Sequence, residues 1–310
     1  MSRLRKALEE YLAVRRAFGF KLRLAGSLLH KFVSFAEQEG ACVITTELAL
    51  RWATQPESAQ PAQWANRLAM VRHFAQYRSA ADPRTEVPPQ GLLPYAFRRN
   101  RPYIYSDDEI TRILGAAQRL PSWKGLRGVT YSTLFGLMAV TGMRVCEPIA
   151  LDREDVDLAR GILVVRKTKF NKSRLVPVHE TTREALRRYA RLRDRICPQP
   201  ETPSFFISEE GTRLTENVVQ KTFVKVSRKI GLRGPQDSHG PRLHDFRHGF
   251  AVRTLLQWYR TGANVERHMP ELSAYLGHAH VNDTYWYLSA TPELLQLAMQ
   301  RFHATGGRSS

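Results

Sequence analysis

A histidine and an arginine lie one helical turn apart at His244 and Arg247, inside a segment whose apolar residues recur with helical spacing. An imidazole exchanges protons near neutral pH, and a planar guanidinium matches the oxygens of a phosphate. The pair therefore suits chemistry on a phosphate ester. By itself His-x-x-Arg is a weak signal, because the pattern also arises by chance.

A second arginine, Arg144, follows Gly142, which we expect to end a helix, and Glu147 lies three residues further on. Two interpretations of this stretch are open. The residues form an ordinary ion pair, or the carboxylate holds the arginine rigidly toward an anion.

The third stretch is Leu276-Gly277-His278, and Tyr287 follows the histidine nine residues later. Pro270 is expected to begin a helix and Gly277 to end it, which places His278 at a turn. The aromatic segment 283–287 is also compatible with a core or interface position. His278 and His280 invite a metal interpretation, but no carboxylate or cysteine set stands at ligand spacing, so no metal site is predicted.

The pattern downstream of residue 105 predicts the scaffold for these side chains. A capping box at Ser106-Asp107-Asp108-Glu109 begins it, and the alternating segments Ile162–Lys167 and Arg174–Val178 predict a β-hairpin with a basic tip. The other expected elements are a helix ending near Thr141, helices over 182–195, 215–230, 243–260 and 270–276, a strand over 205–207, and a last helix from Thr291. Residues 106–310 are thus predicted to form a mainly helical α+β domain with a small sheet.

Residues 1–82 show the periodicity of a separate helical domain, with Gly19 and Gly40 as stops and Thr45 and Thr46 as candidate N-caps of its third helix. Arg67 and Arg72 lie off the apolar stripe of its last helix. A solvated face and a phosphate-binding face are equally compatible with them. Prolines interrupt the periodicity over 83–105, which predicts a basic linker.

The chain is strongly basic: its 310 residues include 47 Lys and Arg against 29 Asp and Glu, a net charge of +18. Such a balance favours a nucleic acid over an anionic membrane, because neutralising phosphates releases condensed counterions. Three scattered cysteines, no apolar run long enough for a bilayer and no secretory leader predict a cytoplasmic protein. The predicted DNA contacts are Arg67, Arg72, Arg98, Arg99, Arg101, Lys172 and Arg174.

Taken in order, these stretches resemble the tyrosine-recombinase (phage-integrase-like) family. Its signature is Thr-Gly-x-Arg-x-x-Glu, a hairpin lysine, His-x-x-Arg, Leu-Gly-His and a tyrosine nine residues on. The matching residues are Arg144, Lys169, His244, Arg247, His278 and Tyr287. Residues 1–82 are similar only in general character to a SAM-like core-binding domain. Thr168 and Phe170 replace the family's glycines at the hairpin tip, so Lys167 and Lys172 stay alternatives to Lys169.

The resemblance implies a site-specific recombinase or integrase, serving a mobile element, that cleaves and rejoins DNA through a 3′-phosphotyrosyl bond to Tyr287. The phosphate would be held by Arg144, Arg247 and His278, with Glu147 supporting the first arginine. His244 would act as general base and Lys169 would protonate the 5′ leaving oxygen. Neither a metal, ATP nor another cofactor is expected.

The implied partner is double-stranded DNA with an inverted-repeat recombination site, in the nucleoid. A homo- or hetero-tetramer would bind two such sites, linked by exchange of the helix that follows Thr291; packing of this helix on its own domain is the alternative. Two other functions stay open: relaxation of DNA in the manner of a type IB topoisomerase, and non-catalytic DNA binding on the same fold.

Overall fold

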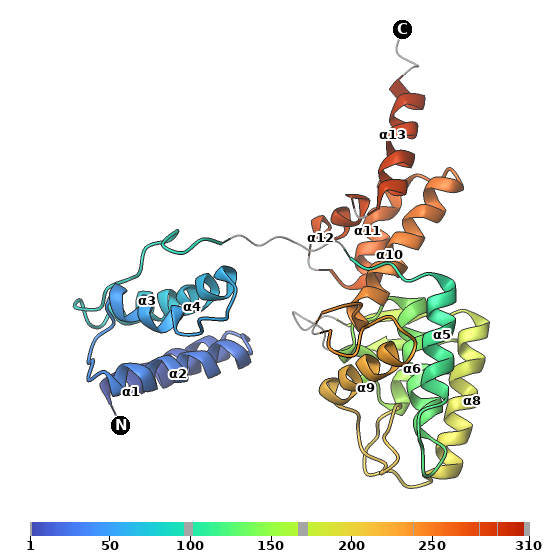
Figure 1. Ribbon diagram of the computed structural model, residues 1–310, viewed down its shortest axis with the longest axis horizontal. Helices are drawn as coiled ribbons and strands as arrows, with labels where there is room; N and C mark the ends of the chain where they lie inside the picture. Colours follow the sequence, from blue (N-terminus) through green and yellow to red (C-terminus); the bar gives the residue numbers. More distant parts are fainter. Residues whose placement is uncertain are drawn as a thin grey trace. The chain divides into compact units, whose positions relative to one another are not determined.

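The computed structural model describes residues 2–95, 102–166, 173–237, 239–278, 280–289 and 291–306, except the side chains of 289 and 302–306. The chain divides into two compact units, Met1–Asn100 and Arg101–Ser310 (Figure 1). Each unit has its own hydrophobic core. Both are mainly helical, and the small sheet lies in the second, so the predicted mainly helical fold class is confirmed.

The first unit is built from four helices: α1 (Arg3–Ala17), α2 (Arg23–Gln38), α3 (Thr46–Thr54) and α4 (Pro61–Ser79). Their apolar stripes meet in one core around Phe32, Trp52 and Phe74. Thr45 caps α3 by accepting a hydrogen bond from the backbone N–H of Leu48 at 3.1 Å, as its residue type predicts.

The second unit contains a larger set of helices. They are α5 (Asp107–Gln118), α6 (Arg127–Thr141), α7 (Cys146–Ala150), α8 (Glu180–Ile196), α9 (Glu216–Lys229), α10 (Leu243–Arg260), α11 (Val265–Leu276), α12 (Asn282–Tyr285) and α13 (Pro292–Gly306), with short 3-10 helices η1 (Arg153–Asp155) and η3 (Trp286–Ser289). Helix α6 packs against both α5 and α8. Edge-on contacts of Phe223 with Phe135 and Phe246 join α6, α9 and α10, so the helix that carries His244 and Arg247 is fixed in the core.

The sheet has three antiparallel strands in the order β1 (Val156–Asp157), β2 (Ile162–Val165) and β3 (Arg174–Pro177). Val165 pairs with Arg174 at the end of the β2–β3 hairpin next to its tip, so the predicted hairpin is confirmed. Its tip, with Lys169 and Lys172, lies outside the described residues.

The predicted strand over 205–207 is wrong. Ile207 makes an isolated bridge to Arg213, and the backbone N–H of Phe205 donates to Leu151 O at 2.8 Å. The segment is apolar and buried like a strand, but its hydrogen-bond partners are loops and the Tyr189 hydroxyl rather than a neighbouring strand.

The prediction that Pro270 begins a helix is also wrong, because Pro270 lies inside α11. The helix begins at Val265, where the side chain of Asn264 accepts a hydrogen bond from the Arg267 backbone N–H at 3.1 Å. Proline has no backbone N–H, so the carbonyl of Glu266, in the first turn of the helix, receives no hydrogen bond from position 270. An N-terminal cap therefore set the boundary, not the proline.

Candidate active site

Two glycines end the helices that approach the site. Gly142 ends α6 with φ 63°, and Gly277 ends α11 with φ 69°, as predicted. This left-handed conformation favours glycine. A Cβ on Gly142 would lie 2.8 Å from the Phe250 ring, and one on Gly277 would lie 2.9 Å from Nη1 of Arg174. Arg144 and His278 follow these turns, so both are placed by helix ends.

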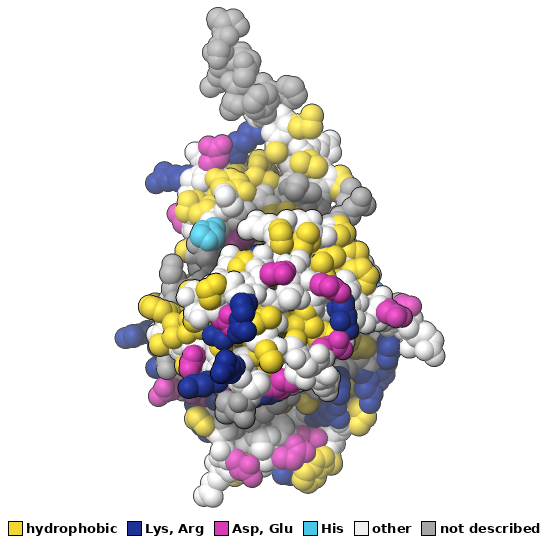
Figure 2. Space-filling view, turned by 90° about the vertical axis from the view of Figure 1, so that its left-hand side faces the viewer, with side chains coloured by type: hydrophobic (Ala, Val, Ile, Leu, Met, Phe, Trp, Pro, Cys, Tyr) yellow, Lys and Arg dark blue, Asp and Glu magenta, His cyan; other side chains and the backbone are white. Residues whose placement is uncertain are grey.

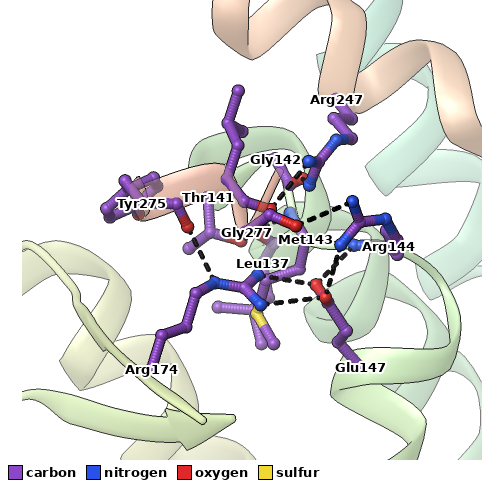
Figure 3. A network of polar contacts seen from close by, with 11 residues as sticks. Leu137, Thr141, Gly142, Met143, Arg144, Glu147, Arg174, Arg247, Tyr275 and Gly277 are labelled. Atoms are coloured by element: carbon purple, nitrogen blue, oxygen red, sulfur yellow. Dashed lines mark hydrogen bonds and ion pairs between the residues drawn. The ribbon is translucent and has the colours of Figure 1, made fainter. Parts of the chain in front are cut away.

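Arg144 is held at three points. Its backbone N–H donates to Oε2 of Glu147 at 2.8 Å, its Nη1 donates to Oε1 at 3.1 Å, and its Nη2 donates to the carbonyl of Gly277 at 3.1 Å (Figure 3). Of the two interpretations open from sequence, the rigidly held arginine describes this geometry, since the contacts join α6, α7 and the end of α11.

Glu147 carries a second arginine. Arg174 of β3 donates from Nη1 to Oε1 at 2.9 Å and from Nη2 to Oε2 at 2.8 Å, and its Nε donates to Tyr275 O at 2.7 Å (Figure 3). Burial alone would raise the pKa of Glu147, but the hydrogen bond and charge of Arg174, with Arg144, outweigh it and lower that pKa. The carboxylate stays ionised between two guanidinium groups.

Arg247 is buried on α10 and donates to two backbone carbonyls, Gly142 O at 3.0 Å and Leu276 O at 2.7 Å. Burial, and then the charge of Arg144, lower the pKa of its guanidinium to about 10, so the group stays charged at neutral pH. Arg144 and Arg247 therefore converge on consecutive carbonyls, those of Leu276 and Gly277, at the turn that leads into His278.

His278 lies beside this pair of arginines. Its Nδ1 is 2.6 Å from Oγ1 of Thr284, which fixes the ring, and the ring is nearly parallel to that of Tyr287, with centroids 6.2 Å apart. Burial, followed by the charges of Arg247 and Arg144, lowers the pKa of His278 to about 4. The ring is thus neutral at neutral pH and presents one N–H donor.

Tyr287 lies in η3 and is 3% exposed, whereas its neighbour Tyr285 is 42% exposed. Its ring packs at 5.5 Å from that of His248, and its Oη is 3.2 Å from Nδ1 of that histidine. The structure therefore distinguishes the two tyrosines: Tyr287 faces the histidines of the site.

His248 was not among the residues predicted from the sequence. It follows His244 by one turn of α10, and the two rings contact edge-on with centroids 4.7 Å apart. By residue surface area His244 is exposed. Its ring is nevertheless partly buried among its neighbours, and this burial, followed by the charge of Arg247, lowers the pKa of His244 to about 4. The i,i+4 spacing of the two histidines is the signal that would have found the second one.

The remaining predicted residues are described by their own contacts. Arg67 donates to Trp52 O and Ala53 O and stacks on the Trp52 ring at 3.8 Å, and Arg72 donates to Pro88 O and Pro89 O. Arg174, also predicted as a DNA contact, is 12% exposed and forms an ion pair with Glu147. Arg98, Arg99, Arg101, Lys169 and Lys172 lie outside the described residues.

Within the described ranges, no group of three or more His, Cys, Asp and Glu side chains is placed to hold a metal ion. Among the same residues no helix has the length and apolar character needed to cross a membrane. Positive charge at the site comes from arginines: Arg144 and Arg174 contact the carboxylate of Glu147, and Arg247 lies near Arg144.

Comparison with known proteins gives a consistent assignment. Residues 104–293 match the Phage integrase family. The chain is 50% identical to the putative integrase/recombinase y4rB of Sinorhizobium fredii over 97% of each chain. It is 29% identical to tyrosine recombinase XerD of Caulobacter vibrioides, over 79% of this chain and 76% of that protein.

Solved structures show the same fold at low identity. The Tn1549 transposon integrase in complex with transposon right end DNA has a TM-score of 0.67 at 16% identity, covering 97% of this chain and 99% of that one. The XerH site-specific recombinase bound to its difH substrate has a TM-score of 0.65 at 18% identity, covering 90% and 78%.

Proposed function

Because the chain belongs to the phage integrase family of tyrosine recombinases, we propose that it cleaves and rejoins DNA through a 3′-phosphotyrosyl intermediate on Tyr287. One observation carries this proposal. Arg144 and Arg247 come from separate elements and converge on the carbonyls of Leu276 and Gly277, beside His278 and Tyr287. Such a cluster of cationic donors around a phenol suits a phosphodiester and its nucleophile.

The two arginines and His278 are assigned to the non-bridging oxygens of the scissile phosphate. A guanidinium has five N–H donors, so an arginine anchored to backbone carbonyls keeps donors for a phosphate. The transition state carries more charge on these oxygens than the ground state, and donors fixed in advance stabilise it. Each is worth about 3 kcal/mol by analogy with the deletion of one oxyanion-hole donor.

The nucleophile and the leaving group need proton transfers in opposite directions. Tyr287 loses its proton as its oxygen bonds to phosphorus, and Lys169 is assigned to protonate the departing 5′ oxygen. His244, at the rim of the cluster, stays in the proposed set because its ring packs against that of His248. The phosphotyrosyl bond conserves the energy of the phosphodiester, so the second strand transfer needs no ATP. The arginines and Lys169 supply the positive charge that a metal ion supplies in many nucleases.

The proposed partner is double-stranded DNA with inverted repeats at the ends of a mobile element, within the nucleoid of the cytoplasm. Relatives named integrase/recombinase, and a transposon integrase of the same fold, support this context. We assign residues 1–82 to DNA binding as a core-binding domain, 83–105 to a linker and 106–310 to catalysis.

Helix α13 supports the proposed tetramer. Leu294 is buried where α13 packs on α10, but Leu295 and Met299, one turn apart, are exposed. Hydrophobic side chains of this helix lie at the surface near the top of Figure 2. An apolar pair on the far side of a terminal helix suits a neighbouring subunit, while Leu294 accounts for packing on its own unit.

A plasmid assay tests the function. Supercoiled plasmids carrying two copies of the DNA that flanks the gene are incubated in EDTA with the wild type or with Tyr287→Phe. Recombinant products that require Tyr287 would support the proposal. Relaxation of a plasmid without such flanks, and no recombinants, would contradict it in favour of a topoisomerase.

A further inference from the structure

The imidazole of His248 lies between a phenol and a carboxylate. Its Nδ1 is 3.2 Å from Oη of Tyr287, and its Nε2 is 4.0 Å from Oδ1 of Asp245. The side chain is 12% exposed and that of Asp245 is 2% exposed. This order of groups, a nucleophile, an imidazole and a buried carboxylate, is the order in which a histidine removes a proton from a hydroxyl.

The surrounding residues fix this ring and the Asp245 carboxylate. Trp286 and His244 pack on it with ring centroids 5.3 and 4.7 Å away. Asp245 is held by the capping box of α10, where it accepts hydrogen bonds from the Arg242 backbone N–H at 2.7 Å and from its Nη2 at 3.0 Å. The histidine therefore faces Tyr287 from a rigid position rather than from a loop.

We propose that His248 is a catalytic residue of the reaction proposed above, on which this inference rests: it orients the hydroxyl of Tyr287 and takes its proton, the role that the family resemblance gave to His244. In the cleavage step the Oη–H bond of Tyr287 breaks and an N–H bond forms at Nδ1 of His248. The phenol oxygen bonds to phosphorus while the bond from phosphorus to the 5′ oxygen breaks, and that oxygen receives its proton from Lys169. Reversal of these transfers rejoins the strand.

The protonation state fits this role. Burial, and then the neighbouring His244, lower the pKa of His248 to about 4, so the ring is neutral and has a lone pair to accept with. The other charged groups near the ring are Asp245, Arg242 and Arg247. A bound phosphodiester adds negative charge and raises the pKa of the ring toward neutrality. An Nε2–H toward Asp245 leaves Nδ1 free for the phenol, and the carboxylate then stabilises the imidazolium.

The test begins with the nicked duplex from the gene flanks on which the wild type forms a covalent adduct. His248→Asn keeps a polar atom near the position of Nδ1 but cannot take a proton. We expect adduct formation under single turnover to fall about 100-fold or more, with unchanged binding of the duplex. His268→Asn is the matched control. His268 lies on α11 with its Nδ1 at hydrogen-bond distance, 2.8 Å, from Oε2 of Glu271, so this variant is expected to leave the rate unchanged.

Two further measurements place the defect on the nucleophile. A duplex with sulfur in place of the 5′ bridging oxygen has a leaving group that needs no proton, so it should restore Lys169→Ala and not His248→Asn. A fluorinated, more acidic tyrosine at position 287 should recover part of the rate of His248→Asn, which a misfolded protein could not do.

The outcomes separate the two proposals. An adduct that His248→Asn forms at the wild-type rate, or a defect that the sulfur duplex repairs fully, would overturn the role of His248 and leave Tyr287 as nucleophile. A wild type that binds every flanking duplex without an adduct would contradict the proposed function and this inference with it.

Discussion

Arg174 of β3 and Glu147 of α7 form a two-pronged ion pair with N–O distances of 2.9 and 2.8 Å, and the two side chains are only 12% and 5% exposed. The same carboxylate accepts from Arg144. The strand that leaves the hairpin tip is thereby joined to Arg144, the arginine that we assign to the phosphate. Glu147 thus fixes two elements of the proposed site at once.

Arg174→Ala should lower the free energy of unfolding by about 3 kcal/mol, because it leaves the Glu147 carboxylate buried with one guanidinium instead of two. Chemical denaturation measures the loss. Arg153→Ala is the control, since its pair with Asp194 is exposed on both sides and is worth no more than about 1 kcal/mol. Equal losses in the two variants would show that the buried pair is not structural.

Arg247→Lys should slow covalent-adduct formation about 100-fold or more while the duplex still binds, since an ammonium cannot span Gly142 O and Leu276 O and also reach a phosphate. Arg253→Lys is a close control. Arg253 lies on the same helix and also donates to two backbone carbonyls, Tyr105 O and Ala139 O. Both variants should be less stable than the wild type, but only Arg247→Lys should form the covalent adduct more slowly. A comparable loss of rate in both would remove Arg247 from the proposed site.

Gly277→Ala should destabilise the protein by more than Gly262→Ala, although both glycines follow helices with nearly the same φ, 69° and 70°. Left-handed backbone costs an alanine about 1 kcal/mol at either position. Only at Gly277 does the added Cβ meet a neighbour, Nη1 of Arg174 at 2.9 Å. Denaturation curves of the two variants give the difference, and identical midpoints would argue against the close approach.

Stability should fall on acidification in the window from about pH 6.5 to pH 4.5. The folded pKa of His248 is lowered to about 4 from 6.5, so the unfolded chain binds more protons in this window and is favoured as pH falls. The shift corresponds to at most about 3 kcal/mol. Glu147 also has a lowered pKa, but its contribution is lost only below its ordinary value of 4.5.

His248→Asn should therefore lose less stability between pH 6.5 and 4.5 than the wild type does, while His268→Asn should follow the wild type. Urea denaturation at several pH values gives both slopes. A slope in His248→Asn that equals that of the wild type would mean that His248 is not held neutral by its surroundings.

The helix ends and the hairpin that flank the site could be predicted from residue types and their spacing along the sequence. Gly142 and Gly277 end their helices as their residue type requires, and these ends set the positions of Arg144 and His278. The hairpin followed from alternation over 162–167 and 174–178.

What the sequence could not provide depends on contacts between distant residues. From its residue type and its place beside the hairpin tip, Arg174 was predicted to contact DNA. Its hydrogen bonds to Glu147 and Tyr275 depend on how β3 packs, which the sequence does not reveal. The i,i+4 spacing could have placed His248 beside His244, but the contact of His248 with Tyr287, 39 residues later, depends on the fold. The helix start predicted at Pro270 was wrong because the helix is capped by Asn264, six residues earlier, and continues through the proline.

The most direct test of the central claim is covalent capture on nicked duplexes that tile the DNA flanking the gene, in EDTA, with denaturing electrophoresis. Tyr285→Phe is the control for Tyr287→Phe, since Tyr285 lies in the same segment but is 42% exposed. We predict an adduct with the wild type and with Tyr285→Phe, and none with Tyr287→Phe. An adduct that survives Tyr287→Phe, or that disappears with Tyr285→Phe, would contradict the assignment of Tyr287 as the nucleophile.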